Sequence, residues 1–149
     1  PQGRATVSSS RIQSPGVGDH VFFYGTLMSP FHRPGRQRVD SKLIYKGRGT
    51  IRAALFDLGI YPAAVPDDSG VVWGEVYETS DAASVLGVLD EIEGYRPDEP
   101  ARSLYTRMLA DVTIEGGAVQ PAWAYFYNAP LGRAPRIVSG DYLEHLNGR

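Results

Sequence analysis

Two parts of this 149-residue chain combine residue types and spacings that can carry out chemistry. The first is Tyr24-Gly25-Thr26-Leu27, where a run of apolar residues reaches a glycine and a short turn. Consecutive backbone N–H groups in such a turn can hold a carboxylate or a developing oxyanion. A strand that ends in glycine is also typical of an ordinary turn, so a purely structural interpretation stays open.

The second part centres on Glu93, next to Gly94 at the end of a predicted helix. In an α-helix each residue is rotated by about 100° about the helix axis from the one before it. On this basis the apolar side chains of positions 85–92 form one stripe along the helix, and Glu93 lies about 50° from the centre of that stripe. Asp90 and Glu91 lie farther away, so Glu93 is the acid that we expect to face inward. An inward carboxylate can serve as a general acid or base. It can equally be a structural acid paired with one of three arginines, namely Arg96, Arg102 or Arg107.

Other catalytic signatures are absent from this sequence. It contains no cysteine and none of the G-x-S-x-G, G-x-x-x-x-G-K-[ST] or H-E-x-x-H motifs. The three histidines, His20, His32 and His145, lack the spacing of metal ligands on a helix. We therefore expect no metal site, and we expect each histidine to face solvent.

Strands and helices must position the turn and the acid, and the sequence of residues 21–56 indicates the first of these elements. Residues 21–24 are apolar throughout, which is typical of a central strand covered on both faces, and Gly25 ends that strand. Ser29-Pro30 is compatible with the start of a short helix that Pro34-Gly35 would stop. Residues 43–56 are mostly strand-like.

Two further turn signals predict hairpins. Asp67-Asp68-Ser69-Gly70 predicts the turn of a hairpin whose second arm is residues 71–78. Glu115-Gly116-Gly117 predicts a second hairpin between residues 105–114 and 123–127. The sequence therefore contains at least five strands.

The clearest helix begins after Thr79-Ser80, where a hydroxyl group can cap it, and Asp81 suits the positive end of its dipole. We expect it to end at Gly94, and we expect a short second helix over residues 142–146. Hairpins outnumber crossovers, which favours an α+β domain on a mixed, strongly curved sheet or barrel.

Composition sets the domain organisation and the classes of partner. Residues 1–18 are rich in Ser, Pro and Gly without periodicity, which predicts a flexible leader before a single domain of residues 19–149. The 15 basic and 17 acidic residues give a net charge of −2, and neither sign forms a run. We therefore expect a small-molecule partner, no nucleic acid and no membrane. The lack of cysteine and of a secretory signal favours a cytoplasmic protein.

Several stretches together resemble one known family. They are VFFYGTL over residues 21–27, LGIYPA over 58–63, GEVY over 74–77, LDEIEGY over 89–95 and Y-T-R over 105–107. In this order, across about residues 20–146, they are similar to the γ-glutamylcyclotransferase-like family. This family is also called AIG2-like and includes the γ-glutamylamine cyclotransferases.

The resemblance implies a fold, a reaction and a site. The implied fold is a small mixed β-barrel flanked by helices. In the implied reaction, the α-amine of a γ-glutamyl group attacks its own side-chain amide, giving 5-oxoproline and a free amine without a cofactor. Glu93 would be the acid and base, and the substrate would bind at Tyr24, Gly25, Thr26 and Leu27.

Three tyrosines complete the candidate site. Alternation along a strand puts Tyr125 and Tyr127 on one face, and together with Tyr105 they are candidates to line the pocket. Packing in the core is an equally good interpretation of all three.

The sequence departs from the family pattern after Leu27. The γ-glutamylamine enzymes have a basic, glycine-containing stretch there, whereas this chain has Met28-Ser29-Pro30-Phe31. The leaving amine therefore stays open, and the sequence gives no indication of oligomeric state. Two alternatives also stay open, a binding module without turnover and an amide hydrolase in which Glu93 activates water.

Overall fold

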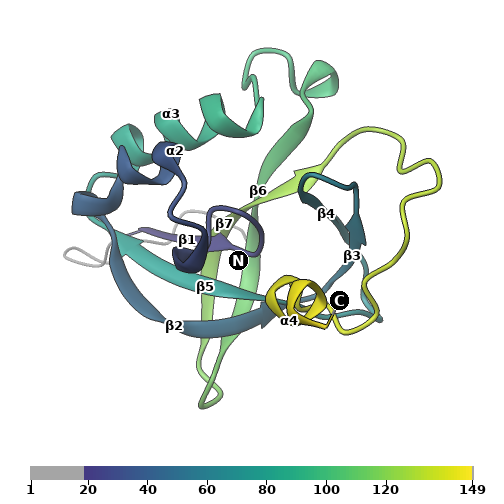
Figure 1. The fold of residues 1–149 in the computed structure, drawn as a ribbon. Helices are drawn as coiled ribbons and strands as arrows, with labels where there is room; N and C mark the ends of the chain where they lie inside the picture. Colours follow the sequence, from purple (N-terminus) through teal and green to yellow (C-terminus); the bar gives the residue numbers. More distant parts are fainter. Residues whose placement is uncertain (1–18, 149) are drawn as a thin grey trace, which may run out of the picture.

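The computed structural model describes residues 19–148, so the predicted leader of residues 1–18 lies outside the described residues. Five strands form a closed barrel with mixed strand directions (Figure 1). In spatial order they are β1 (Asp19–Phe23), β5 (Val72–Thr79), β2 (Ile44–Ile51), β6 (Tyr105–Ile114) and β7 (Val119–Tyr127). The expected α+β fold with a small mixed barrel is confirmed.

Strand β1 is the central strand that its apolar run predicts. It pairs antiparallel with β5, with Phe23 opposite Glu75, and parallel with β7, with Val21 opposite Trp123. Residues 20–23 are all buried. Because β1 is held on both edges, the turn that follows it starts from a fixed point in the barrel wall.

A separate two-stranded sheet corrects the first predicted hairpin. Strand β3 (Ala53–Asp57) pairs with β4 (Pro62–Pro66), whereas β5 pairs with β1 and β2, so Asp67–Gly70 is a turn between sheets. The chain reverses earlier, at Leu58–Tyr61, where Gly59 has a φ of 104° and the Leu58 N–H donates to the Tyr61 carbonyl. Residues 43–56 accordingly divide into β2 and β3.

The second predicted hairpin is confirmed. β6 and β7 pair antiparallel from Tyr105 opposite Tyr127 to Thr113 opposite Val119. Gly116 and Gly117 both have positive φ in the turn, a conformation that glycine adopts without steric cost.

Helix α3 (Ala82–Glu93) ends where the sequence predicts, at Gly94 in the left-handed region with a φ of 68°. Its start differs in one detail, because the Asp81 carboxylate caps it by accepting from the Ser84 N–H. Helix α4 (Tyr142–Asn147) is also as predicted. Within residues 19–148, three 3₁₀ turns cover Ser29–Phe31, Asp40–Lys42 and Pro100–Arg102.

The short helix predicted from Ser29-Pro30 is the 3₁₀ turn Ser29–Phe31, and it ends before Pro34. Pro34 itself opens a second short helix, α2 (Pro34–Gln37), which the sequence patterns did not predict. The first position of a helix tolerates proline because its N–H would have no partner inside the helix.

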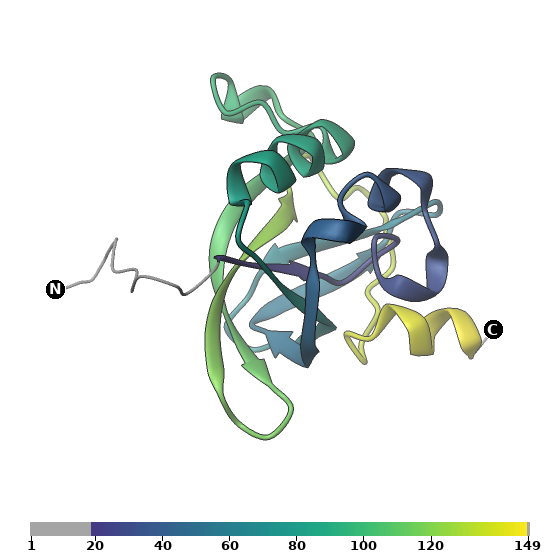
Figure 2. The ribbon, with the colours of Figure 1, turned by 90° about the vertical axis from the view of Figure 1, so that its left-hand side faces the viewer.

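The helices are distributed so that two of them meet at one end of the barrel. Figures 1 and 2 show α3 and α2 together at that end, while α4 lies at the other. Gly35 of α2 packs so closely on α3 that a Cβ there would lie 2.9 Å from Ile92 Cδ1. The end of α3 is thus brought beside the segment that follows β1. No helix among the described residues is long and apolar enough to cross a membrane.

Candidate active site

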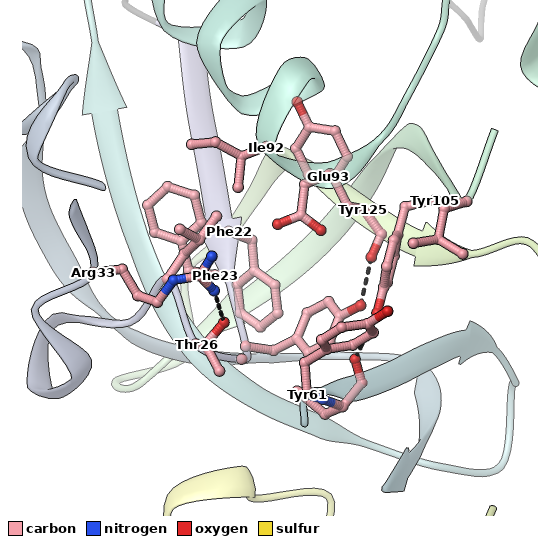
Figure 3. Close-up of a pocket in the computed structure, with 14 residues that line it drawn as sticks. Phe22, Phe23, Thr26, Arg33, Tyr61, Ile92, Glu93, Tyr105 and Tyr125 are labelled. Atoms are coloured by element: carbon pink, nitrogen blue, oxygen red, sulfur yellow. Dashed lines mark hydrogen bonds between the residues drawn. The ribbon is translucent and has the colours of Figure 1, made fainter. Parts of the chain in front are cut away.

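A pocket of about 280 Å³ opens where the end of α3 meets the turn after β1 and the loop before β4 (Figure 3). This volume is near the lower end of the range for small-molecule sites, about 300–1,000 Å³. The lining residues are Phe22, Phe23, Tyr24, Gly25, Thr26, Leu27, Arg33, Tyr61, Pro62, Ile92, Glu93, Leu104, Tyr105 and Tyr125. The pocket therefore brings the two predicted chemical groups, the turn and the acid, together.

Glu93 is the last residue of α3, and its carboxylate points into the pocket (Figure 3). The left-handed Gly94 turns the chain so that the Tyr95 N–H donates to the Asp90 carbonyl at 2.9 Å. A helix that ends in this way stops directly after the acid. The side chain of Glu93 is thereby left at the mouth of the barrel.

The three arginines that could neutralise Glu93 have other partners. Arg107 binds Asp90, with Nη1 2.7 Å from Oδ2. Arg96 and Arg102 both bind Glu99, at 2.6 and 3.0 Å. Within residues 19–148, the Glu93 carboxylate accepts no hydrogen bond and has no cationic nitrogen within 4 Å. The structural-pairing interpretation of this acid is therefore wrong.

Asp90 overturns part of the helical-wheel prediction, since it is only 9% exposed. Its carboxylate accepts from the Tyr125 hydroxyl at 2.6 Å and from Arg107 Nη1 at 2.9 and 2.7 Å. The wheel located only the apolar face of α3. The barrel also presents polar partners to the neighbouring face, and these satisfy a buried acid.

Burial raises the pKa of Glu93 from 4.5 to about 7, while the nearby Arg33 guanidinium acts in the opposite direction. Desolvation disfavours the charged form, and no cation is close enough to restore it fully. A carboxyl group with this pKa accepts and returns protons near neutral pH, as a general acid and base must.

The turn after β1 supplies hydrogen-bond donors to the same pocket. The Tyr24 hydroxyl donates to the Tyr125 carbonyl at 2.6 Å and accepts from the Ala64 N–H at 3.3 Å, which fixes the start of the turn. In the part of the chain that the structure describes, the N–H groups of Gly25, Thr26 and Leu27 donate to no protein acceptor. All three residues line the pocket, so these N–H groups are the candidate donors to a ligand.

Gly25 is required by a close approach. A Cβ at this position would lie 2.9 Å from Pro62 Cγ, and the φ of Gly25 is not positive. The glycine therefore lets the turn pack directly on the loop before β4.

The three candidate tyrosines have different positions. Tyr105 lines the pocket and donates to the Pro62 carbonyl at 2.9 Å. Tyr125 lines it with its ring, while its hydroxyl binds Asp90. Tyr127 lies outside the lining and packs edge-on against Tyr105, with ring centroids 5.3 Å apart. Tyr127 supports the wall from behind.

The motifs did not single out Arg33, which is the cation among the lining residues. Its signal is the basic, glycine-containing stretch His32-Arg33-Pro34-Gly35-Arg36, which follows the Met28–Phe31 segment that marks the departure from the family pattern. The sequence patterns also did not predict several aromatic and aliphatic residues that line the pocket. Those residues are Phe22, Phe23, Tyr61, Pro62, Ile92 and Leu104.

Two histidines also differ from expectation. His20 in β1 is buried, and His145 Nε2 lies 2.8 Å from Asp57 Oδ2. Only His32 faces solvent as predicted. Tertiary contacts, which sequence spacing does not reveal, determine both of the other positions.

Comparison with known proteins agrees with this arrangement. Residues 21–144 match the model of the family described as "Gamma-glutamyl cyclotransferase, AIG2-like". The chain belongs to this family. The match includes the turn after β1 and Glu93, so both halves of the pocket lie inside the segment that defines the γ-glutamylcyclotransferase-like family.

Individual relatives cover nearly the same segment. The γ-glutamylcyclotransferase family protein YtfP of Escherichia coli K12 is 34% identical over 125 residues, which is 83% of this chain and 96% of that protein. The solution structure of YtfP from E. coli has a TM-score of 0.59 at 31% identity and covers 85% of this chain and 97% of its own. The crystal structure of a mouse AIG2-like protein has a TM-score of 0.63 at 24% identity, with coverage of 85% and 88%. The mouse protein shares the fold.

Proposed function

We propose that this chain is an enzyme that converts a γ-glutamyl amine or γ-glutamyl peptide into 5-oxoproline and a free amine, with Glu93 as general acid and base. One observation carries the proposal. An unpaired carboxylate with a pKa of about 7 lines the same small pocket as a turn with three free N–H groups. Family membership adds support for this class of reaction.

The proposed reaction takes place within one substrate molecule. Glu93 accepts a proton from the α-ammonium, and the freed amine attacks the γ-carbonyl carbon to form the five-membered ring. The leaving nitrogen takes this proton back from Glu93 as its bond to that carbon breaks. The ring nitrogen gives up its own second proton, which Glu93 passes to the departing amine, so the amine leaves as an ammonium ion. Protons and electron pairs balance without any other reactant.

The pocket assists by holding the folded substrate. The N–H groups after β1 are suited either to the carbonyl oxygen as it gains charge or to the α-carboxylate. Because nucleophile and electrophile belong to one molecule, holding them at reacting distance removes much of the entropic barrier. Phe22, Ile92, Leu104 and Tyr105 give the pocket apolar walls that restrict water near the carbonyl.

The test is incubation of the protein with a panel of γ-glutamyl amino acids and γ-glutamyl amines, with detection of products by mass spectrometry. We expect 5-oxoproline. Formation of glutamate would instead indicate a hydrolase, and binding without any product would indicate a binding module. Either outcome would overturn the proposal.

The matched variants are Glu93→Gln and Glu91→Gln. Glu91 is on the same helical turn but is exposed and paired with Arg38 at 2.8 Å. We expect Glu93→Gln to lose at least about 100-fold in kcat, the low end for removal of a general base, and Glu91→Gln to stay close to the wild type. Equal activity of the two variants would exclude Glu93 as the acid and base.

A further inference from the structure

Arg33 is the feature of the pocket that the proposed reaction does not use. Its Nη1 donates to Thr26 Oγ1 on the turn after β1, and it lines the pocket. Among the described residues, no carboxylate oxygen lies within 4 Å of its guanidinium. It is near enough to Glu93 to oppose the rise in that pKa without forming an ion pair with it.

The backbone around Arg33 is built to hold it there. His32 has a φ of 50°, and among residues 19–148 it is the one non-glycine residue with positive φ. A side chain larger than hydrogen is disfavoured in this conformation, so its presence marks a position that the surrounding structure enforces. It closes the 3₁₀ turn of Ser29–Phe31 by donating its N–H to the Ser29 carbonyl.

Two anchors fix this segment on either side of Arg33. The Ser29 N–H and hydroxyl each donate to the Glu75 carboxylate at 2.8 Å. Arg36, which is buried, donates to the Leu27 carbonyl at 2.7 Å and binds Asp40. Arg33 therefore extends from a preorganised loop, and preorganisation lowers the cost of ligand binding.

The position of Arg33 indicates which part of a substrate it meets. Arg33 is exposed, whereas Phe22, Tyr105 and Tyr125, which line the pocket at greater depth, are buried. Figure 3 shows the guanidinium and the Glu93 carboxylate reaching into the pocket from different sides. If the glutamyl part occupies the buried end of the pocket, the leaving group extends toward solvent and lies closest to such a rim residue.

The charged groups of the two substrate classes also favour contact between Arg33 and the leaving group. A γ-glutamyl amino acid carries one ammonium and two carboxylates, whereas a γ-glutamyl amine has only the ammonium and one carboxylate. Glu93 can pair with the ammonium, and the free N–H groups after β1 can hold one carboxylate. The second carboxylate then matches the guanidinium, whose forked donors suit it. A leaving group without a carboxylate would leave Arg33 without a charged partner, with only its hydrogen bond to Thr26.

We propose that Arg33 binds a carboxylate on the leaving group, so that the pocket selects γ-glutamyl amino acids over γ-glutamyl amines. This inference rests on the proposed function and names its substrate class. Thr26 orients the guanidinium, and the apolar walls accept the side chain of a small amino acid.

The test uses two probes that differ by one group, γ-glutamyl-alanine and γ-glutamyl-ethylamide. The ethylamide lacks the leaving-group carboxylate and is otherwise the same, and γ-glutamyl-alaninamide retains its bulk without its charge. Rates are compared at pH 8.5, which is above the pKa of Glu93, so that Glu93 is deprotonated both in the wild type and in Arg33→Met. We expect kcat/KM of the wild type to favour the alanine substrate at least about 10-fold over both neutral ones.

In Arg33→Met that preference should fall by at least about 10-fold, and Arg33→Lys should restore part of it. Arg38→Met is the matched control, because Arg38 is an exposed arginine that binds Glu91 outside the pocket. The control should keep the wild-type ratio. An equal loss for all three substrates would place Arg33 on the shared glutamyl part and overturn the inference, as would an unchanged ratio.

Binding to Glu93→Gln separates this inference from the proposed function. Calorimetry on that variant, with and without Arg33→Met, measures discrimination between the same probes without turnover. Discrimination that depends on Arg33, in a protein that forms no 5-oxoproline, would support the inference and refute the reaction. Turnover of the ethylamide equal to that of the dipeptide would support the reaction and refute the inference.

Discussion

Replacing Glu93 by Gln should make the protein more stable while it removes activity. Burial raises the pKa of Glu93 from 4.5 to about 7, so the folded protein holds this proton more tightly than the unfolded chain. As the pH rises from about 4.5 to about 7, the folded state must give up a proton that the unfolded chain has already lost. The free energy of unfolding of the wild type therefore falls over this range and then levels.

The full rise in pKa corresponds to about 3 kcal/mol. Because Glu93 is only partly buried at the mouth of the pocket, solvent screening reduces the expected effect to about 1–2 kcal/mol. Urea unfolding of the wild type, Glu93→Gln and Glu91→Gln at pH 4, 6 and 8 measures it. We expect Glu93→Gln to gain on the wild type between pH 4 and 8, and Glu91→Gln to follow the wild type. Parallel stability profiles for all three proteins would refute the argument that burial sets this pKa.

Three other predictions follow from the contacts of the site. The pH profile of kcat/KM should rise through a pKa near 7, where Glu93 becomes the base, and a limb below pH 5 would contradict this. Arg107→Met leaves the buried carboxylate of Asp90 uncompensated, so chemical denaturation should show a loss of about 3 kcal/mol or more in the free energy of unfolding. The double variant with Asp90→Asn should recover part of this loss, and strictly additive losses from the two substitutions would argue against the ion pair. Gly25→Val forces side-chain atoms into Pro62, so the free energy of unfolding should fall by about 1–3 kcal/mol, and calorimetry should show weaker ligand binding. A melting temperature and a ligand affinity equal to those of the wild type would refute the close approach.

Local patterns predicted the features that depend on neighbours in the chain. The apolar run before Gly25 was enough to predict β1, and the stripe on α3 together with Gly94 was enough to predict where Glu93 points. The glycines of the β6–β7 turn likewise marked a real hairpin. In each case the residues that decide the structure lie within a few positions of one another.

The features that were missed depend on partners far apart in the sequence. Asp90 is buried because Arg107 and Tyr125, 17 and 35 residues away, satisfy its carboxylate. The turn at Asp67–Gly70 resembles a hairpin turn, yet β4 pairs backward with β3 because the chain has already reversed at Gly59. No periodicity within one element carries that information.

Both charges of the pocket are positioned by one junction between α2 and α3. Arg33 directly precedes α2 and Glu93 ends α3, and the two helices are joined by the close contact of Gly35 with Ile92 and by the ion pair of Arg38 with Glu91. Exposed ion pairs contribute little to stability, so the apolar contact sets the spacing. Ile92 packs against the barrel core without being part of its fully buried cluster, so we expect a change of side chain at this junction to alter the distance between the acid and the guanidinium at less cost in stability than a change inside the core. For the proposed enzyme, we therefore expect this junction to influence which leaving group is accepted, while the turn after β1 stays fixed by the barrel strands.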